Sequence, residues 1–177
     1  MRVVGGTLGG RLLRAPKGSA TRPTSDRVRE ALFSILASID GARVLDLFAG
    51  SGALGIEALS RGAAAATFVD SAVAAVAAVR QNLDELGLQG EVLRMPALRA
   101  LACTPVAEHE YDLVFLDPPY RLASSLGPEL STALPPVLAQ GARVVVESDR
   151  RGPLDLDLEL LRERQYGDTL LRVHVAR

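Results

Sequence analysis

The chain has 177 residues, of which 48% are hydrophobic and 23% charged, and its formal net charge is −1, which is ordinary for one soluble globular domain. A single cysteine, Cys103, excludes a disulfide framework, and with only two histidines, His109 and His174, it excludes a Cys/His metal centre. The sequence has no apolar run of membrane-spanning length and no signal-peptide core, so we expect a cytoplasmic protein that binds no metal.

The charge is distributed unevenly along the chain. Residues 1–30 have a net charge of +5, whereas the remainder has a net charge of −6. The basic side chains of the first thirty residues are Arg2, Arg11, Arg14, Lys17, Arg22, Arg27 and Arg29. A basic segment on an acidic body favours a polyanionic partner, although a solvated charged face would have the same composition.

The first predicted elements are a hairpin and a helix. Residues 2–14 predict a short hairpin that turns at Gly9-Gly10, because glycine permits the positive φ of a tight turn. After a loop, residues 24–38 have apolar side chains at helical spacing, with Thr24, Ser25 and Asp26 as candidate caps. This pattern predicts an amphipathic helix that leads into the core.

From residue 43 the sequence alternates between strand and helix patterns. Strands are expected at 44–48, 66–69, 91–95, 112–116 and 143–147, and helices at 53–61, 71–86, 98–103 and 124–138. Residues 158–165 and 169–175 predict an antiparallel hairpin. The repeated βαβ order predicts an α/β fold with a mostly parallel sheet and helices on both of its faces.

A glycine-rich loop follows the first of these strands. Gly50, Gly52 and Gly55 have the spacing G-x-G-x-x-G, which lets a ligand approach the backbone closely. Asp70 ends the second strand, where a carboxylate can accept hydrogen bonds from a ribose diol. This pattern fits a dinucleotide or S-adenosylmethionine. Asp46 would oppose a pyrophosphate but attract the cationic methionine end of S-adenosylmethionine, so it favours the second cofactor.

The segment Asp117-Pro118-Pro119-Tyr120 follows the predicted strand at 112–116. The carboxylate of Asp117 and the carbonyl of Pro118 are two acceptors, the prolines have no competing N–H, and Tyr120 offers a flat face for stacking. The tetrapeptide therefore suits an exocyclic amino group on a ring. A Pro-Pro pair after a strand can also be an ordinary loop that ends the strand.

The order and spacing of these motifs resemble the Rossmann-like S-adenosylmethionine-dependent amino-methyltransferases. More narrowly, nearly the whole chain is similar to the bacterial family that methylates guanine N2 in small-subunit (16S) rRNA. The matching segments are residues 22–33 and 45–63, Val3-Val4-Gly5-Gly6 with Gly10-Arg11, Glu147, and Tyr166-Gly167-Asp168-Thr169. The resemblance implies a class I methyltransferase fold: a seven-stranded, mostly parallel sheet with an antiparallel C-terminal hairpin, plus an N-terminal hairpin and helix.

The resemblance also implies the roles of individual residues. Asp46 would lie near the methionine amino group, Asp70 would hold the ribose, and Pro96 stands where such enzymes often have an acidic residue for adenine. The full set expected to bind S-adenosylmethionine, with S-adenosylhomocysteine as the product, is Thr24, Asp46, Ala49, Gly50, Gly52, Asp70, Ser71 and Ala97. The expected catalytic residues are Asp117, Pro118 and Tyr120, without a metal.

The expected partner is 16S rRNA, within a small ribosomal subunit or its assembly intermediate, and the expected oligomeric state is a monomer. Residues 1–23 would be a basic hairpin and loop that docks RNA through the basic side chains named above, and residues 24–177 the methyltransferase domain, the two forming one compact unit. Two alternatives stay open: an amino-methyltransferase acting on DNA adenine or protein glutamine, and a noncatalytic RNA-binding assembly factor. A nicotinamide dehydrogenase is disfavoured by Asp46.

Overall fold

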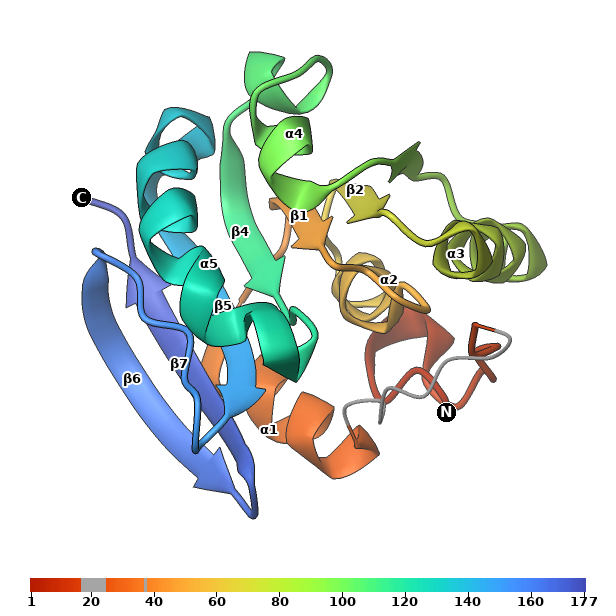
Figure 1. Cartoon of the computed structure of the whole chain (residues 1–177). Helices are drawn as coiled ribbons and strands as arrows, with labels where there is room; N and C mark the ends of the chain where they lie inside the picture. The colour runs from red at the N-terminus through yellow and green to blue at the C-terminus, as the bar shows by residue number, and fades with distance from the viewer. Residues whose placement is uncertain (17–24, 37) are drawn as a thin grey trace.

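Seven strands form one mixed sheet in the computed structural model, which describes residues 1–16, 25–36 and 38–177 (Figure 1). Their order across the sheet is β3-β2-β1-β4-β5-β7-β6, with only β7 antiparallel to its neighbours. The strands are β1 (Arg43–Leu47), β2 (Ala65–Asp70), β3 (Glu91–Arg94), β4 (Tyr111–Leu116), β5 (Leu138–Asp149), β6 (Glu159–Tyr166) and β7 (Thr169–Val175). The predicted topology, including the antiparallel C-terminal hairpin, is confirmed.

Helices cover both faces of this sheet, as Figure 1 shows. One face packs against α1 (Asp26–Leu36), α2 (Ala53–Ser60) and α3 (Val73–Leu86), and the other packs against α4 (Ala97–Leu101) and α5 (Tyr120–Ala133). Because successive strand residues point to opposite faces, Val44 and Leu45 in β1 enter different cores. Both are fully buried, which explains why the central strands are apolar without alternation.

Two elements, α5 and β5, have bounds that differ by several residues from the sequence expectation. Helix α5 begins at Tyr120 rather than near residue 124, directly after Pro119, which occupies the N-cap position. It ends at Ala133 because Pro135 and Pro136 follow, and they form the short 3-10 helix η3 (Pro135–Val137) instead. Strand β5 consequently begins at Leu138, five residues before its expected start.

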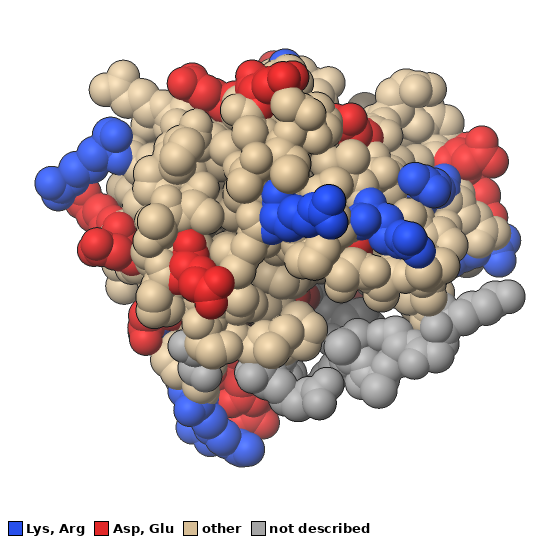
Figure 2. All heavy atoms as spheres, turned by 45° about the horizontal axis from the view of Figure 1, so that its top comes forward, with Lys and Arg blue, Asp and Glu red and all other residues tan. Residues whose placement is uncertain are grey.

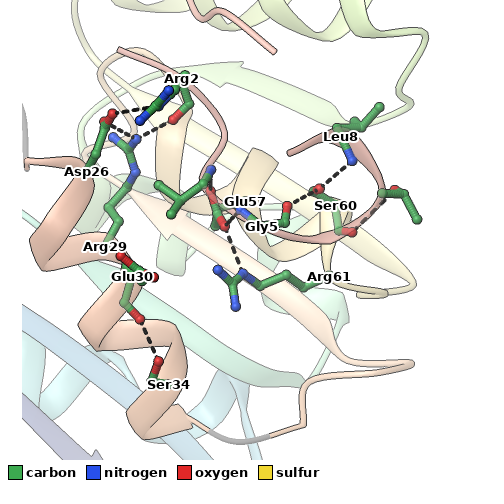
Figure 3. A network of polar contacts seen from close by, with 12 residues as sticks. Arg2, Gly5, Leu8, Asp26, Arg29, Glu30, Ser34, Glu57, Ser60 and Arg61 are labelled. Carbon is green, nitrogen blue, oxygen red and sulfur yellow. Dashed lines mark hydrogen bonds and ion pairs between the residues drawn. The ribbon is translucent and has the colours of Figure 1, made fainter. Parts of the chain in front are cut away.

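The N-terminal segment, which we define as residues 1–14, corresponds to the predicted hairpin but has little strand pairing. It has one antiparallel bridge, between Arg2 and Leu12, and a 3-10 helix, η1 (Gly6–Leu8), lies before its turn. Glu57 in α2 is fully buried and accepts hydrogen bonds from the N–H groups of Val4 at 2.7 Å and Gly5 at 2.8 Å (Figure 3). The segment is therefore held by the helix that follows the glycine loop.

A second 3-10 helix, η2 (Val106–Glu108), precedes β4. Within the part of the chain that the structure describes, no helix is both long enough and apolar enough to span a bilayer.

Candidate cofactor and target-base site

The register of the central strands brings the predicted site residues to one edge of the sheet. Leu47, the last residue of β1, pairs with Val69 of β2 on one side and with Leu116 of β4 on the other. Asp70 and Asp117 are the next residues after these two partners. The predicted cofactor residue and the predicted amine acceptor thus flank the carboxyl end of β1, where open α/β sheets bind ligands.

The loop after β1 has an unusual backbone. Phe48, Gly50 and Gly52 all have positive φ, at 69°, 56° and 78°. The turn is closed by hydrogen bonds from the N–H of Ala49 to the carbonyl of Val69 at 3.0 Å and from the N–H of Gly52 to the carbonyl of Ala49 at 2.7 Å. Glycine adopts this conformation without the steric penalty that Phe48 incurs.

The glycines of the loop have different physical uses. Among the described residues, a Cβ added at Gly50 would meet only the carbonyl oxygen of Phe48, at 4.0 Å, so a ligand could approach the backbone at Gly50. A Cβ added at Gly55 would lie 2.3 Å from the ring of Phe68. The third glycine of the motif therefore serves the close packing of α2 on β2, whereas the first is available to a cofactor.

Asp46 is a buried acid beneath the loop, only 2% exposed. Its Oδ2 accepts a hydrogen bond from the N–H of Gly55 at 3.0 Å. The pKa of Asp46 is raised to about 7, mainly by burial and to a smaller extent by the negative charge of Asp70, while the hydrogen bond from Gly55 acts in the opposite direction. In its ionised form, Asp46 would stabilise a cation bound at this position.

Asp70 connects the glycine loop to the end of β2. Its Oδ2 accepts the N–H of Gly50 at 2.9 Å and its Oδ1 accepts the N–H of Ala72 at 2.8 Å. Each carboxylate oxygen has a second lone pair, so these bonds fix the carboxylate and still leave acceptor capacity for two ribose hydroxyls. Ser71, the next residue, is exposed at the same edge.

The region expected to hold adenine is formed by the turn after β3. Met95 donates its N–H to the carbonyl of Asp70 at 3.1 Å. Pro96 is the N-cap residue of α4 and its carbonyl accepts the N–H of Ala100 at 3.0 Å. Pro96 thus has a local role in starting α4, and Ala97 lies buried at the first helical position.

The segment Asp117-Pro118-Pro119-Tyr120, which was expected to hold the target amine, follows β4 directly. Asp117 is partly exposed, Pro118 is buried and Pro119 is exposed, so the carboxylate of Asp117 borders solvent at the edge of the sheet. Tyr120 is the first residue of α5, but its side chain lies outside the described part of the structure, as do residues Lys17, Arg22 and Thr24.

Arg29 was expected to contact RNA, and the structure corrects this expectation. The side chain of Arg29 is fully buried and donates to the carbonyl of Arg2 and, at 2.8 Å, to Oδ1 of Asp26 (Figure 3). A guanidinium with no exposed surface cannot reach a phosphate. Arg29 instead joins α1 to the N-terminal segment.

Two of the other expected RNA-binding arginines have exposed ion pairs. Arg2 lies 3.3 Å from Asp26 and Arg14 lies 2.7 Å from Glu85, with at least 60% of each arginine side chain exposed. Exposed pairs of this kind contribute only about 0–1 kcal/mol, so a phosphate could replace the carboxylate at low cost. Figure 2 shows basic and acidic side chains interspersed over one face of the molecule rather than a single large basic patch.

Sequence reasoning missed Asn82 as a residue connected to the site. Asn82 is 1% exposed and donates a hydrogen bond from Nδ2 to the carbonyl of Ser51 in the glycine loop at 2.9 Å. The available signal was its position on α3, because Asn82 falls at helical spacing with the buried Ala75, Ala78 and Val79. A polar residue on an apolar stripe requires a buried partner.

Comparison with known proteins assigns these motifs to a family. A family model described as "Conserved hypothetical protein 95" matches residues 1–175. The chain belongs to this family. The "Putative rRNA methyltransferase YlbH" of Bacillus subtilis is 40% identical over an alignment that covers 100% of both chains. The "Ribosomal RNA small subunit methyltransferase D" of Escherichia coli is 45% identical over 125 residues, covering 68% of this chain and 61% of that protein.

A solved structure supports the same assignment. The "Putative methyltransferase yhhF from Escherichia coli" superimposes with a TM-score of 0.85 and 38% identity, covering 100% of this chain and 98% of that one. The predicted family and the Rossmann-like methyltransferase fold are confirmed, and with them S-adenosylmethionine-dependent methyl transfer as the reaction class.

Proposed function

We propose that this protein methylates the exocyclic N2 of a guanine in small-subunit (16S) rRNA, with S-adenosylmethionine as the methyl donor. The observation that carries the proposal is the pairing of Leu47 with both Val69 and Leu116, because it brings Asp70 and Asp117 to either side of one glycine loop. A ribose-binding carboxylate and an amine acceptor at the ends of the two strands that flank β1 would be the two halves of a methyl-transfer site. The relatives named as rRNA methyltransferases support RNA as the substrate class.

The cofactor half would be formed by residues on β1 and β2 and at the start of α4. Asp46 would attract the methionine ammonium group, Ala49, Gly50 and Gly52 would line the methionine portion, and Asp70 with Ser71 would bind the ribose. Ala97 would contribute to adenine binding, and Thr24 would cover the cofactor. When bound, S-adenosylmethionine supplies a methyl group on a positively charged sulfur and leaves as S-adenosylhomocysteine.

The acceptor half would hold guanine N2. The lone pair of this nitrogen is delocalised into the ring, so the nitrogen must become pyramidal to react. Hydrogen bonds from its two N–H groups to the Asp117 carboxylate and the Pro118 carbonyl favour that geometry and stabilise the positive charge that develops on nitrogen. After transfer, one N2 proton is lost, and the carboxylate of Asp117 would accept it. Tyr120 would stack on the unstacked base.

The basic part of the chain would bind the flanking phosphates. We assign this role to Arg2, Arg11, Arg14, Lys17, Arg22 and Arg27, with residues 1–23 as an RNA-docking part and residues 24–177 as the methyltransferase domain. The substrate would be rRNA within a small subunit or an assembly intermediate, bound by a monomer in the cytoplasm.

Mass spectrometry of small-subunit rRNA from a strain that lacks the gene tests the proposal. We expect one N2-methylguanine to disappear and to return when the wild-type gene is supplied, but not when the Asp117→Ala variant is supplied. Retention of every N2-methylguanine in the deletion strain would refute guanine N2 as the target.

Calorimetry with S-adenosylmethionine separates the remaining alternatives. An assembly factor without catalysis would bind rRNA but not the cofactor, whereas a DNA or protein methyltransferase would bind the cofactor and leave small-subunit rRNA unmodified in vitro. Naked rRNA, an assembly intermediate and the complete subunit should be assayed in parallel to define the physical substrate.

A further inference from the structure

Asn82 joins two segments that are far apart in the sequence. Its Oδ1 accepts the N–H of Arg14 at 2.8 Å, and its Nδ2 donates to the carbonyl of Arg14 at 3.1 Å and to the carbonyl of Ser51 at 2.9 Å. Both N–H groups of the amide and its carbonyl are used. Because two carbonyls face Nδ2 and one N–H faces Oδ1, this arrangement admits only one orientation of the amide.

Ser51 lies at the centre of the cofactor loop. It stands between Gly50 and Gly52, both with positive φ, and its carbonyl belongs to the peptide whose N–H donates to Ala49 at 2.7 Å. Holding the Ser51 carbonyl therefore fixes the plane of the Ser51–Gly52 peptide. That plane determines the direction of the backbone at the two glycines.

Arg14 is the last residue of the N-terminal segment, whereas the segment contacts α2 through Val4, Gly5 and Leu8. Glu57 holds Val4 and Gly5, and Ser60 accepts the N–H of Leu8 at 2.9 Å and donates to the carbonyl of Gly5 at 2.6 Å (Figure 3). These contacts dock the segment without reaching the loop. Asn82 is bonded to both the segment and the loop, through a side chain that is almost completely buried.

We propose that Asn82 is a positioning residue for cofactor binding. It holds the Ser51 carbonyl in the orientation that the loop needs to receive S-adenosylmethionine, and its two bonds to the backbone of Arg14 fix the amide group in place. The proposal rests on the assignment of Gly50 and Gly52 to the cofactor in the proposed function. Asn82 does not touch the target base, so its effect should be on cofactor affinity rather than on the maximal rate.

The test is the substitution Asn82→Asp in the full chain. Aspartate keeps the size and the acceptor for Arg14 but has no donor, and its charge faces two carbonyls. We expect the Kd of S-adenosylmethionine by calorimetry, and its KM in rRNA methylation, to rise at least tenfold, whereas kcat at saturating cofactor stays within about threefold. Asn82→Ala, which removes all three hydrogen bonds without adding charge, should give the same split and serves if the aspartate variant does not fold.

Two matched variants separate this role from general stabilisation. Glu85→Gln removes the ion pair with the same Arg14, from the same helix, without a contact to Ser51. Ser60→Ala removes two contacts of the N-terminal segment at its distant end. Each variant should bind S-adenosylmethionine with a Kd within about twofold of wild type. Ser60→Ala should also lower the Tm.

Two results would overturn the role of Asn82: a cofactor Kd in Asn82→Asp within twofold of wild type, or an equal rise in Kd in Ser60→Ala. Both results can be interpreted only if the wild-type protein binds S-adenosylmethionine. Failure of the wild type to bind the cofactor would instead refute the cofactor site, and cofactor binding without rRNA methylation would refute the proposed substrate.

Discussion

Gly50 donates its backbone N–H to Oδ2 of Asp70 at 2.9 Å, so the carboxylate that ends β2 also holds the loop that follows β1. The second oxygen of Asp70 is fixed by Ala72. One side chain therefore determines both the position of a ribose acceptor and the geometry of the backbone beside it. A change at Asp70 should therefore affect cofactor binding in two ways, through the lost ribose acceptor and through the altered glycine loop.

Replacing Asp70 by alanine should weaken S-adenosylmethionine binding by at least tenfold. The variant loses two proposed hydrogen bonds to the ribose, each contributing about 1 kcal/mol, and also the support of the glycine loop. Calorimetric titration of the purified protein measures the effect. Asp84→Ala, which removes an exposed carboxylate from α3, is the control and should bind normally. An unchanged Kd in Asp70→Ala would contradict the assignment of the ribose site.

The stability of the protein should depend on the ionisation of Asp46. Burial raises the pKa of this group from 3.8 to about 7, so its contribution to stability is complete below about pH 4 and is lost as the pH rises through 7. A rise of this size corresponds to about 4 kcal/mol. Asp46→Asn stays neutral and can still accept the Gly55 N–H, so the variant should not lose this stability.

Urea unfolding at several pH values between 4 and 8 measures the difference. The free energy of unfolding of Asp46→Asn, relative to wild type, should increase steadily from pH 4 to about pH 7 and then remain constant. Parallel stability profiles for the two proteins over this range would show that Asp46 ionises in the folded protein as it does in the unfolded chain.

Substitution of Asp117 should separate chemistry from cofactor binding. Asp117→Ala removes an acceptor for the target amine and should lower kcat by roughly a hundredfold or more, while the Kd of S-adenosylmethionine stays within about threefold. Asp117→Asn retains a carbonyl acceptor and should keep more activity than alanine. Glu110→Ala, an exposed change just before β4, is the control. Comparable losses of cofactor affinity in Asp117→Ala and Asp70→Ala would contradict the division of roles.

Glu57 should be essential for docking the N-terminal segment. It is fully buried and accepts three hydrogen bonds, from the N–H groups of Val4 and Gly5 and from Nε of Arg61 at 2.7 Å. Glu57→Ala leaves buried donors without an acceptor and should lower the free energy of unfolding by about 3–5 kcal/mol. Hydrogen exchange at the Val4 and Gly5 amides should become much faster. If these amides remain as protected as in wild type, Glu57 does not hold the segment.

The positions of Asp46, Asp70 and Asp117 could be predicted because they depend on local pattern and on one general rule. Each residue lies at or next to the carboxyl end of an apolar strand, and parallel strands with helical crossovers place these ends at the same edge of the sheet. The spacing of Gly50, Gly52 and Gly55 indicated that the loop after the first strand allows a ligand to approach the backbone closely. These features are encoded within short stretches of sequence, so they need no knowledge of distant contacts.

The contacts of Asn82, and those of Glu57 with the N-terminal segment, could not be predicted because they join residues 31 to 68 positions apart. Nothing in the local sequence indicates which distant N–H or carbonyl a buried polar side chain will meet. The burial of Arg29 was different, since the residue falls at helical spacing with the buried Leu32, Phe33 and Leu36. Its place on the apolar face of the helix indicated burial. The assignment to RNA binding considered only the charge of Arg29 and not this position.

The long-range contacts of the N-terminal segment determine when it can fold during synthesis. Residues 1–14 are made before their partners Glu57, Ser60 and Asn82, which follow 52 to 68 residues later. The segment must therefore remain undocked until α3 has emerged. A nascent chain arrested before residue 82 would expose this basic segment without its buried carboxamide partner, so the segment becomes fully ordered only after the glycine loop and α3 have both been made.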